Sequence, residues 1–360
     1  MRKYRVGVIG ATGMVGRHFV ALLKDHPFFE LTVVAASSNS TSKTYEEALG
    51  SRINEGVKIP NEFLDLTVFD AQKDVKKIVS LVDFVFCAID ADKDKVRFLE
   101  ELYAKNECCV ISNNSASRWI PDVPMIIPEV NPEHSEIIHA QRKRLDVKRG
   151  FIAVKPNCSL QCYVPALHPL RDFKITKVLV CTYQSISGAG KTFASWPEMT
   201  DNVIPYIPQE EEKTEAEPLK IWGRVKGDRL VNAAGPSITS QCFRIPVSVG
   251  HTSAVFVSFE NKPSLEEIKK RWKLFKGKPW ELNLPSAPKQ FIEYFDDPFL
   301  PQIKKVREDK YSMAVLAGRL REDKQYDYKF VCMSHNALRG AAGGGILMAE
   351  LLSKQGFFDD

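Results

Sequence analysis

The chain has 360 residues, of which 44% are hydrophobic and 26% charged, and its formal net charge is +5. This balance is ordinary for a globular protein and excludes the disordered and collagen-like classes, while the length allows two domains. Basic residues are dense only over 142–149, where Leu145, Asp146 and Val147 interrupt them. Nucleic-acid binding is therefore not expected.

The N-terminal residues are not those of a targeting signal. Met1 is followed almost at once by a strand-like segment, and no window approaches the roughly 18 apolar residues that span a bilayer. The 8 cysteines form no Cys-x-x-Cys pair and show no zinc-type spacing, so we expect neither disulfides nor a metal site. A cytoplasmic protein without membrane association is predicted.

Residues 4–113 alternate short, continuously apolar segments with helical patterns. Buried apolar strands separated by helices are typical of a parallel, doubly wound sheet. The predicted fold class is therefore α/β, with a Rossmann-type first domain. Its expected strands are 5–9, 31–36, 66–69, 83–89 and 108–112.

Beyond residue 158 the expected strands are longer and follow one another with few helices between them. Such a succession indicates a second, α+β domain with a mixed or antiparallel sheet. We expect a first domain of 1–157 completed by a returning C-terminal segment, 335–360, and a second domain of 158–334. The expected strands are 175–183, 241–249, 254–259, 313–319 and 327–333, and the expected helices are 264–275 and 340–352.

A glycine-rich loop follows the first expected strand and opens a helix. Glycines at such a turn let the backbone approach a pyrophosphate, whose charge is stabilised at the helix N-terminus. The strand-turn-helix context makes a dinucleotide site the favoured interpretation over a plain tight turn. The residues expected to bind the cofactor here are Gly10, Thr12, Gly13, Met14, Val15 and Gly16.

The segment after the second expected strand bears on the choice between NAD and NADP. An NAD site carries an acidic residue there, which binds the ribose 2′-hydroxyl. This chain instead has hydroxyl groups and a cation, without a carboxylate, so NADP(H) is the predicted cofactor. The candidate residues are Ser37, Ser38, Ser40 and Lys43.

Cys158 is the candidate nucleophile. It follows Pro156 and Asn157 and precedes a helical pattern, and the positive end of a helix dipole favours thiolate over thiol. The other seven cysteines lie mostly in apolar segments and are expected to be core thiols.

Five motifs recur together, in this order, in one protein family. They are the glycine loop, Pro-Asn-Cys-Ser at 156–159, Gln184 before 187–190, Arg244 seven residues before His251, and Asn336 before 340–344. The whole chain resembles aspartate-semialdehyde dehydrogenase, particularly the archaeal and fungal branch. That resemblance implies a second domain like that of glyceraldehyde-phosphate dehydrogenase, serving catalysis and dimerisation, in a homodimer or homotetramer.

The resemblance also implies the reaction. L-aspartyl 4-phosphate would be reduced by NADPH to L-aspartate 4-semialdehyde through a cysteine thioester, in the biosynthesis of lysine, threonine, methionine and isoleucine. Cys158 would attack the acyl phosphate, and His251 would be the acid/base, with an ordinary pKa of about 6.5. Gln184 would orient the substrate, while Asn157 would either position the reacting oxygen or cap its own loop.

The resemblance also implies that three residues bind the rest of the substrate. Arg244 would grip the α-carboxylate, a task suited to the guanidinium fork. Glu210 would meet the ammonium group and Lys213 the phosphate.

A second set would complete the phosphate and nicotinamide sites. Arg118, with its partner Asn113, corresponds to the phosphate-binding arginine of the family. Ser187, Gly188 and Asn336 correspond to positions near the nicotinamide half of the cofactor.

The chain also departs from the family pattern, and rival functions stay open. Residues 160–162 and 191–193 are unusual, and Asn39 stands where an arginine is common. Malonyl-CoA reductase shares the fold, thiol and histidine but would not need the 210–213 segment for an ammonium group. Reductases of N-acetylglutamyl phosphate or glyceraldehyde phosphate would use the same thioester chemistry. A non-catalytic NADP-binding regulatory protein would need neither Cys158 nor His251.

Overall fold

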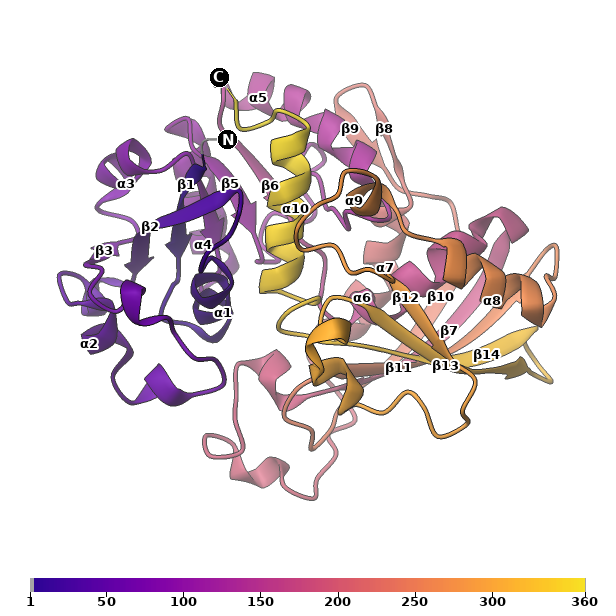
Figure 1. Ribbon diagram of the computed structural model, residues 1–360. Coiled ribbons are helices and arrows are strands. Elements are labelled where there is room, and N and C mark those ends of the chain that lie inside the picture. The colour runs from indigo at the N-terminus through magenta and orange to yellow at the C-terminus, as the bar shows by residue number, and fades with distance from the viewer. Residues whose placement is uncertain (1–2, 360) are drawn as a thin grey trace.

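Two six-stranded sheets organise the molecule, and a short two-stranded hairpin stands apart from both (Figure 1). The computed structural model describes residues 3–359. Met1, Arg2 and Asp360, which belong to the expected first domain, lie outside the described residues. No helix among the described residues is long and apolar enough to cross a membrane.

The first sheet is parallel throughout, with strand order β3-β2-β1-β4-β5-β6. All five segments expected to be its strands contain strands, and β6 is a sixth strand that was not predicted. The order reverses between β1 and β4, and ligands of such sheets bind in the crevice at that point. The strands are β1 Tyr4–Ile9, β2 Phe29–Ala36, β3 Val68–Asp70, β4 Phe84–Cys87, β5 Cys109–Ser112 and β6 Phe151–Val154.

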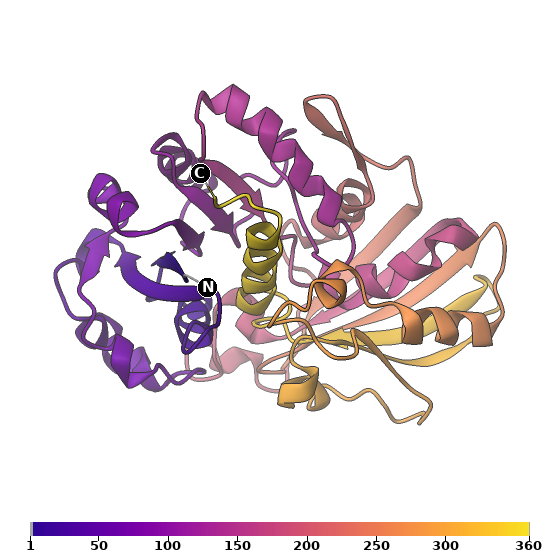
Figure 2. The same cartoon turned by 45° about the horizontal axis from the view of Figure 1, so that its top comes forward.

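The helices of this part connect the parallel strands and cover the sheet (Figures 1 and 2). Apolar side chains from both faces of the sheet are buried, as continuous apolar strands require. The prediction of a Rossmann-type sheet is therefore confirmed. The helices are α1 Met14–Leu22, α2 Tyr45–Leu49, α3 Val75–Leu81, α4 Lys93–Lys105 and α5 Ile138–Leu145.

The second sheet is mixed, with order β10-β7-β11-β14-β13-β12. The β10–β7 and β12–β13 pairs are parallel, and the pairs between them are antiparallel. This confirms the predicted second fold class. The strands are β7 Ile175–Gln184, β10 Ser237–Arg244, β11 His251–Phe259, β12 Ile292–Phe295, β13 Val315–Glu322 and β14 Tyr328–Ser334, with β8 Arg224–Lys226 and β9 Arg229–Val231 in the hairpin.

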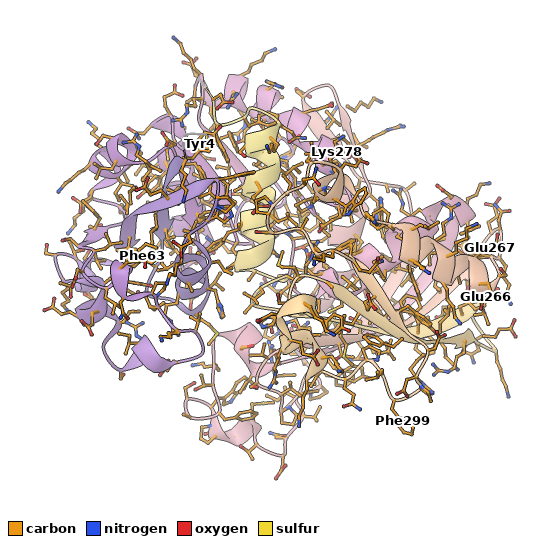
Figure 3. All side chains as sticks on the ribbon, viewed as in Figure 1. Tyr4, Phe63, Glu266, Glu267, Lys278 and Phe299 are labelled. Atoms are coloured by element: carbon orange, nitrogen blue, oxygen red, sulfur yellow. The ribbon has the colours of Figure 1, made fainter. Side chains whose placement is uncertain are left out.

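Helices cover one face of the second sheet. α8 shows why: Ile268 and Trp272 are buried against the sheet, whereas Glu266 and Glu267 point outward (Figure 3). The helices of this part are α6 Leu160–Leu167, α7 Glu210–Ile221, α8 Leu265–Leu274 and α9 Lys278–Glu281.

We call the other face of the second sheet the open sheet face; at β14, its Val331 packs against a small apolar cluster that includes Val306 of a 3-10 helix. Alternate residues of β7 and β11 are only partly buried there, while their neighbours on the inner face are fully buried. Cys181 belongs to the open sheet face, so its prediction as a core thiol was wrong. Its members include Leu179, Cys181, Tyr183, Phe243, Ala254, Phe256 and Val331.

The C-terminal helix α10, Ala342–Lys354, lies between the two sheets in both ribbon views (Figures 1 and 2). Residues 342–352 are all buried, which explains why Glu350, hydrogen-bonded to His26 and Ser286, is the one charged residue among them. Gly345 lets it approach α1, because a Cβ there would lie 2.8 Å from the Phe19 ring. The chain therefore returns to the first sheet after completing the second.

Candidate active site

A cavity of about 280 Å³ lies where the ends of both sheets meet the glycine loop. The first sheet contributes the loops after β5 and β6, and the second contributes the ends of β7 and β10. The cavity thus gathers most of the residues that five separate motifs had nominated. Its lining includes Met14, Val15, Asn113, Arg118, Asn157, Cys158, Gln184, Ser187, Gly188, Glu210, Lys213, Arg244 and Asn336.

Cys158 lies in the turn between β6 and α6, two residues before the first residue of the helix, and Ser159 is the N-cap. Its Sγ is 3.3 Å from Nε2 of His251. Burial, and secondarily the carboxylate of Glu210, raise the pKa of this thiol. The expectation that the helix dipole would by itself favour the thiolate was therefore wrong: desolvation outweighs it.

His251 is the first residue of β11 and is fully buried. Its Nδ1 accepts the backbone N–H of Ser185 at 3.1 Å, so the neutral ring carries its proton on Nε2, facing the sulfur of Cys158. Burial, followed by the nearby Arg244 cation, lowers the pKa of His251 to about 3. The ordinary pKa expected from the sequence is therefore not retained, and the resting imidazole is a neutral hydrogen-bond donor.

A carboxylate forms hydrogen bonds with several residues of the cavity wall beside the thiol of Cys158. Glu210, the first residue of α7, accepts the side-chain amide of Gln184 at 3.0 Å and the hydroxyl of Ser159 at 3.3 Å. Lys213 lies one turn further along α7, with Nζ 3.5 Å from Glu210. The 210–213 segment is thus part of the cavity wall and not a solvated helix face.

Arg244 is held at the end of β10, directly beside Gln184 in the parallel register with β7. Its Nη1 donates to the carbonyl of Ser185 at 2.7 Å. Gly188 makes room for both the guanidinium and the imidazole, because a Cβ there would lie 2.9 Å from Arg244 and from His251. Arginine and histidine therefore face the same small volume.

Arg118 is buried and firmly tied on three sides. Its Nε donates to the carbonyl of Lys155 at 2.9 Å, and a longer contact of 3.4 Å joins Nη2 to the carbonyl of Asn113. Its Nη1 pairs with Glu217 at 2.9 Å. A buried guanidinium beside the cavity can attract an anion while its position is fixed.

Glu217 is a residue that the sequence analysis missed. One carboxylate oxygen pairs with Arg118, and the other accepts the backbone N–H of Asn157 at 2.8 Å. This links the arginine to the loop that carries Cys158. The available signal was helical spacing, since Glu210, Lys213 and Glu217 are separated by three and four residues and share a face of α7.

Asn157 caps its own loop. Its Oδ1 accepts the backbone N–H of Ser159 at 2.9 Å and the Ser159 hydroxyl at 3.1 Å. The loop-capping alternative therefore accounts for the oxygen, while the side chain also lines the cavity.

The cofactor half of the cavity is joined to the histidine by hydrogen bonds. Asn336 donates to the hydroxyl of Ser187 at 2.9 Å and accepts the N–H of Gly250 at 2.8 Å. Ser187 in turn lies 3.1 Å from the Ser185 hydroxyl. Movement at this wall would therefore be transmitted to His251.

The unusual residues after Cys158 have partners of their own. Gln161 is buried, and its side-chain oxygen accepts a hydrogen bond from Nε of Arg339 at 3.1 Å. Arg339 also forms a two-point ion pair with Glu129. Cys162 contacts the carbonyl of His251 at 3.3 Å. These residues tie α6 to the segment before α10, and residues 160–162 do not line the cavity.

The glycine loop fits a dinucleotide. Gly10 has φ of +85° and faces the Ala88 carbonyl after β4, and a Cβ at Gly16 would collide with the Gly10 carbonyl. Gly13, by contrast, is the half-buried N-cap of α1, and a Cβ there would be 3.4 Å from its nearest neighbour. Gly10 and Gly16 therefore shape the turn, and Gly13 keeps the helix N-terminus open to a phosphate.

The residues after β2 lie in a short 3-10 turn, and Lys43 is exposed. Ser38 donates to the carboxylate of Asp70 at 2.7 Å, a neighbour from β3 that the sequence did not reveal. Asp70 also accepts the backbone N–H groups of Gln72 and Lys73. Three hydrogen bonds thus hold the Asp70 carboxylate, whereas Ser37 and Lys43 are exposed and Ser40 is half-buried.

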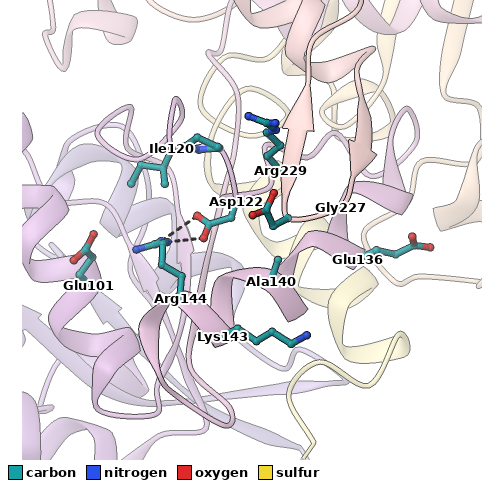
Figure 4. A pocket seen from close by; sticks show the side chains of 11 residues that line it. Glu101, Ile120, Asp122, Glu136, Ala140, Lys143, Arg144, Gly227 and Arg229 are labelled. Atoms are coloured by element: carbon teal, nitrogen blue, oxygen red, sulfur yellow. Dashed lines mark hydrogen bonds and ion pairs between the residues drawn. The ribbon is translucent and has the colours of Figure 1, made fainter.

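A larger cavity, of about 980 Å³, lies away from this chemistry, between α4, α5 and the β8–β9 turn (Figure 4). Arg144 and Asp122 form an ion pair across it. It is lined by neither a cysteine nor a histidine. Size alone therefore does not identify the functional site.

Known proteins agree with this geometry. Two family models match, described as the NAD binding domain of semialdehyde dehydrogenase, over residues 5–138, and its dimerisation domain, over 167–339. Aspartate-semialdehyde dehydrogenase of Archaeoglobus fulgidus is 39% identical over 98% of this chain and 99% of that relative. The chain belongs to the aspartate-semialdehyde dehydrogenase family.

Other members of the family are similar along the whole chain. The Saccharomyces cerevisiae aspartate-semialdehyde dehydrogenase is 36% identical over 96% of each chain. The solved structure of the Candida albicans enzyme with NADP superposes with a TM-score of 0.87 at 35% identity, covering 97% of this chain and 98% of that one. The resemblance drawn from the five motifs is thereby confirmed.

Proposed function

We propose that the protein reduces L-aspartyl 4-phosphate to L-aspartate 4-semialdehyde and inorganic phosphate, in amino acid biosynthesis. The observation that carries this proposal is the Cys158–His251 contact of 3.3 Å inside a cavity that residues of the glycine loop also line. Membership of the aspartate-semialdehyde dehydrogenase family supports the choice of substrate. One NADPH and one proton are consumed for each semialdehyde formed.

NADPH is the proposed cofactor, and when bound it supplies the hydride. The open N-cap at Gly13 would accept the pyrophosphate, and Lys43 with Ser37 and Ser40 would receive the adenosine phosphate. Ser187, Gly188 and Asn336 would hold the nicotinamide end near Cys158. The NADP complex of the Candida albicans relative supports NADP over NAD.

Cys158 forms the covalent bond to the substrate, and His251 assists it. Sγ of Cys158 attacks the acyl carbon, the C–O bond to phosphate breaks, and a thioester forms while the S–H proton leaves with the released phosphate. After reduction, the C–S bond breaks and the sulfur leaves as thiolate. The Nε2–H of His251, which faces the sulfur, donates a hydrogen bond to the negative charge that develops there, and the proton that restores the thiol comes from solvent.

The charged side chains of the cavity fit an amino acid that carries a phosphate. Arg244 would take the α-carboxylate and Glu210 the ammonium group, with Gln184 between them orienting the acyl carbon. Arg118 and Lys213, with Asn113 at the same wall, would bind the phosphate.

The rival functions are less well supported. Malonyl-CoA has no ammonium group to meet Glu210, whose carboxylate lies at the centre of the cavity wall. Eight curated relatives at 35–39% identity are aspartate-semialdehyde dehydrogenases, which favours aspartyl phosphate over other acyl phosphates. A regulatory protein would not require the thiol–imidazole contact.

We also infer a homodimer as the basic assembly. The open sheet face presents apolar side chains, including the stacked pair Tyr183 and Phe243, and the matching family model is described as a dimerisation domain. The two sheets support domains of 1–157 with 335–360 and of 158–334. All eight cysteines are free, which supports a reducing compartment such as the cytoplasm.

Enzyme assays test this function directly. We expect NADPH production from aspartate semialdehyde that depends on phosphate, and none from Cys158→Ser. Cys181→Ser, a matched control on the open sheet face, keeps its activity. Activity with malonyl-CoA but not with aspartate semialdehyde would contradict the proposal.

A further inference from the structure

Glu100 is a buried carboxylate that the proposed mechanism leaves unused. It lies on α4, which packs against β5 and β6, and it is only 1% exposed. Burying a carboxylate is costly unless hydrogen bonds compensate it. The groups that donate to Glu100 therefore show what this side chain holds in place.

The two carboxylate oxygens of Glu100 bind both ends of one short loop. Oε1 accepts the hydroxyl of Ser112, the last residue of β5, and Oε2 accepts the hydroxyl of Ser117 at 2.5 Å. Between them, the side-chain amide of Asn114 lies 3.4 Å from Oε1. Both serines are buried, so each hydroxyl depends on this acceptor.

The loop that Glu100 closes carries the proposed phosphate site. We call residues 113–118 the phosphate loop, because its first and last residues are proposed to bind the phosphate of the substrate. Asn113 and Arg118 both line the cavity, and Ser117 directly precedes Arg118. The bond from Ser117 to Glu100 therefore acts one residue away from a guanidinium of the site.

The phosphate loop is neither helix nor strand, so side chains have to hold its shape. Within it, the backbone N–H of Arg118 reaches the carbonyl of Ser115 only at a long 3.4 Å. Arg97, which shares a face of α4 with Glu100, donates from Nη2 to the carbonyl of Ala116 at 3.1 Å. Two side chains one turn apart on a regular helix thus fasten the loop.

Glu350 is a buried carboxylate of the same kind, away from the cavity. It lies in α10 and accepts the hydroxyl of Ser286 at 2.6 Å, while Nε2 of His26 is 2.9 Å from the same oxygen. Neither partner lines the cavity. The two glutamates are therefore matched in burial and in hydrogen bonding, but only Glu100 is tied to the proposed phosphate site.

We propose that Glu100 positions the phosphate loop, so that Asn113 and Arg118 are held where the phosphate of the substrate binds. It is a positioning residue, because it acts through the hydroxyls of Ser112 and Ser117 and does not itself line the cavity. Its oxygens serve as hydrogen-bond acceptors, and its negative charge is not what the loop requires. The inference rests on the proposed function, since it concerns the phosphate of that reaction.

Phosphate kinetics test this role. In Glu100→Met the acceptors are lost, and we expect the KM for phosphate, in the oxidation of aspartate semialdehyde, to rise about tenfold, or about 1.4 kcal/mol. The turnover at saturating phosphate should change less, and the dissociation constant of NADPH should not change. Glu100→Gln returns the KM to near the wild-type value, because its amide oxygen accepts from Ser112 and its N–H donates to the Ser117 hydroxyl.

The matched control is Glu350→Met, which removes the other buried carboxylate. We expect it to lower the thermal unfolding temperature and to leave the KM for phosphate unchanged. Equal rises of the KM in both variants, or an unchanged KM in a folded Glu100→Met, would overturn the inference. A Glu100→Gln that is as impaired as Glu100→Met would also overturn it, because charge and not hydrogen bonding would then be responsible.

Ser117→Ala tests the same contact with a change that leaves the carboxylate in place. It removes one hydrogen bond, and we expect the KM for phosphate to rise roughly threefold. Added to Glu100→Met, it should cause no further rise, because both changes break the same bond; rises that multiply would contradict the inference. A wild type without phosphate-dependent activity would contradict the proposed function, whereas an active wild type whose KM both variants keep would contradict this inference alone.

Discussion

At the scale of single residues, burial makes the catalytic pair neutral at rest. Desolvation raises the pKa of Cys158 and lowers that of His251 to about 3. A neutral thiol is protected from oxidation and adventitious alkylation. Substrate charge and the neighbouring cations, rather than the imidazole alone, then decide when the sulfur becomes nucleophilic.

His251→Asn tests the donor role of the imidazole. We expect turnover to fall by about 10²-fold or more, the usual contribution of a positioned proton donor, because the group facing the sulfur at 3.3 Å is lost. Steady-state NADPH production measures this. His139→Asn, at an exposed position on α5, is the control that keeps its rate; equal rates in the two variants would remove His251 from the mechanism.

At the scale of elements, the site is built where strands end and helices begin. Helix α1 after β1 and the 3-10 turn after β2 carry the proposed cofactor residues. On the substrate side, α7 supplies Glu210, Lys213 and Glu217 from one face. Helix N-termini and strand ends expose backbone donors and short loops, which is why function concentrates there.

Gly13 and Gly16 belong to the same glycine loop but have different roles, which substitutions can distinguish. Gly13→Ala should leave stability within about 1 kcal/mol, since the N-cap position is open, while weakening NADPH binding by crowding the pyrophosphate. Gly16→Ala should instead destabilise the fold by about 1–3 kcal/mol, because its Cβ meets backbone. Fluorescence titration with NADPH and denaturant unfolding distinguish the two; similar stability losses in both would contradict this division.

At the scale of the whole molecule, the two sheets share one buried helix and leave one face open. α10 joins the sheets, and Cys158 lies at the junction, so the cavity draws residues from both. The open sheet face lies on the opposite side of the second sheet from α8, where strand residues alternate between full and partial burial. The partly exposed apolar residues of this face support the inferred dimer.

Phe256→Glu tests the assembly. Its ring lies on the open sheet face and is partly buried in the single chain, so a carboxylate there would be desolvated in a dimer and should shift the protein to monomer. Sedimentation velocity at fixed protein concentration measures this. Phe299→Glu is the control, because Phe299 is 79% exposed in a loop after β12 (Figure 3). A monomeric wild type would contradict the inferred dimer.

The sequence by itself determined the features whose residues are close together along the chain. The glycine loop after β1 and the Pro-Asn-Cys turn after β6 are local, since their chemistry depends on neighbours within a few residues. Apolar runs likewise predicted most strands, because a strand buried on both faces leaves that pattern in its own residues. The sequence did not predict β6, β8, β9 or β12, although it predicted β4 and β5, which are as short as β6 and β12.

Only the tertiary structure decided which distant groups meet and what their burial does. Glu217 reaches Arg118 across 99 positions of the chain and Asn157 across 60, and Asp70 of β3 reaches Ser38. The pKa directions of Cys158 and His251 follow from desolvation, which no linear pattern encodes. The sequence therefore gives the identity of each site residue, whereas the charge state of its side chain depends on the folded surroundings.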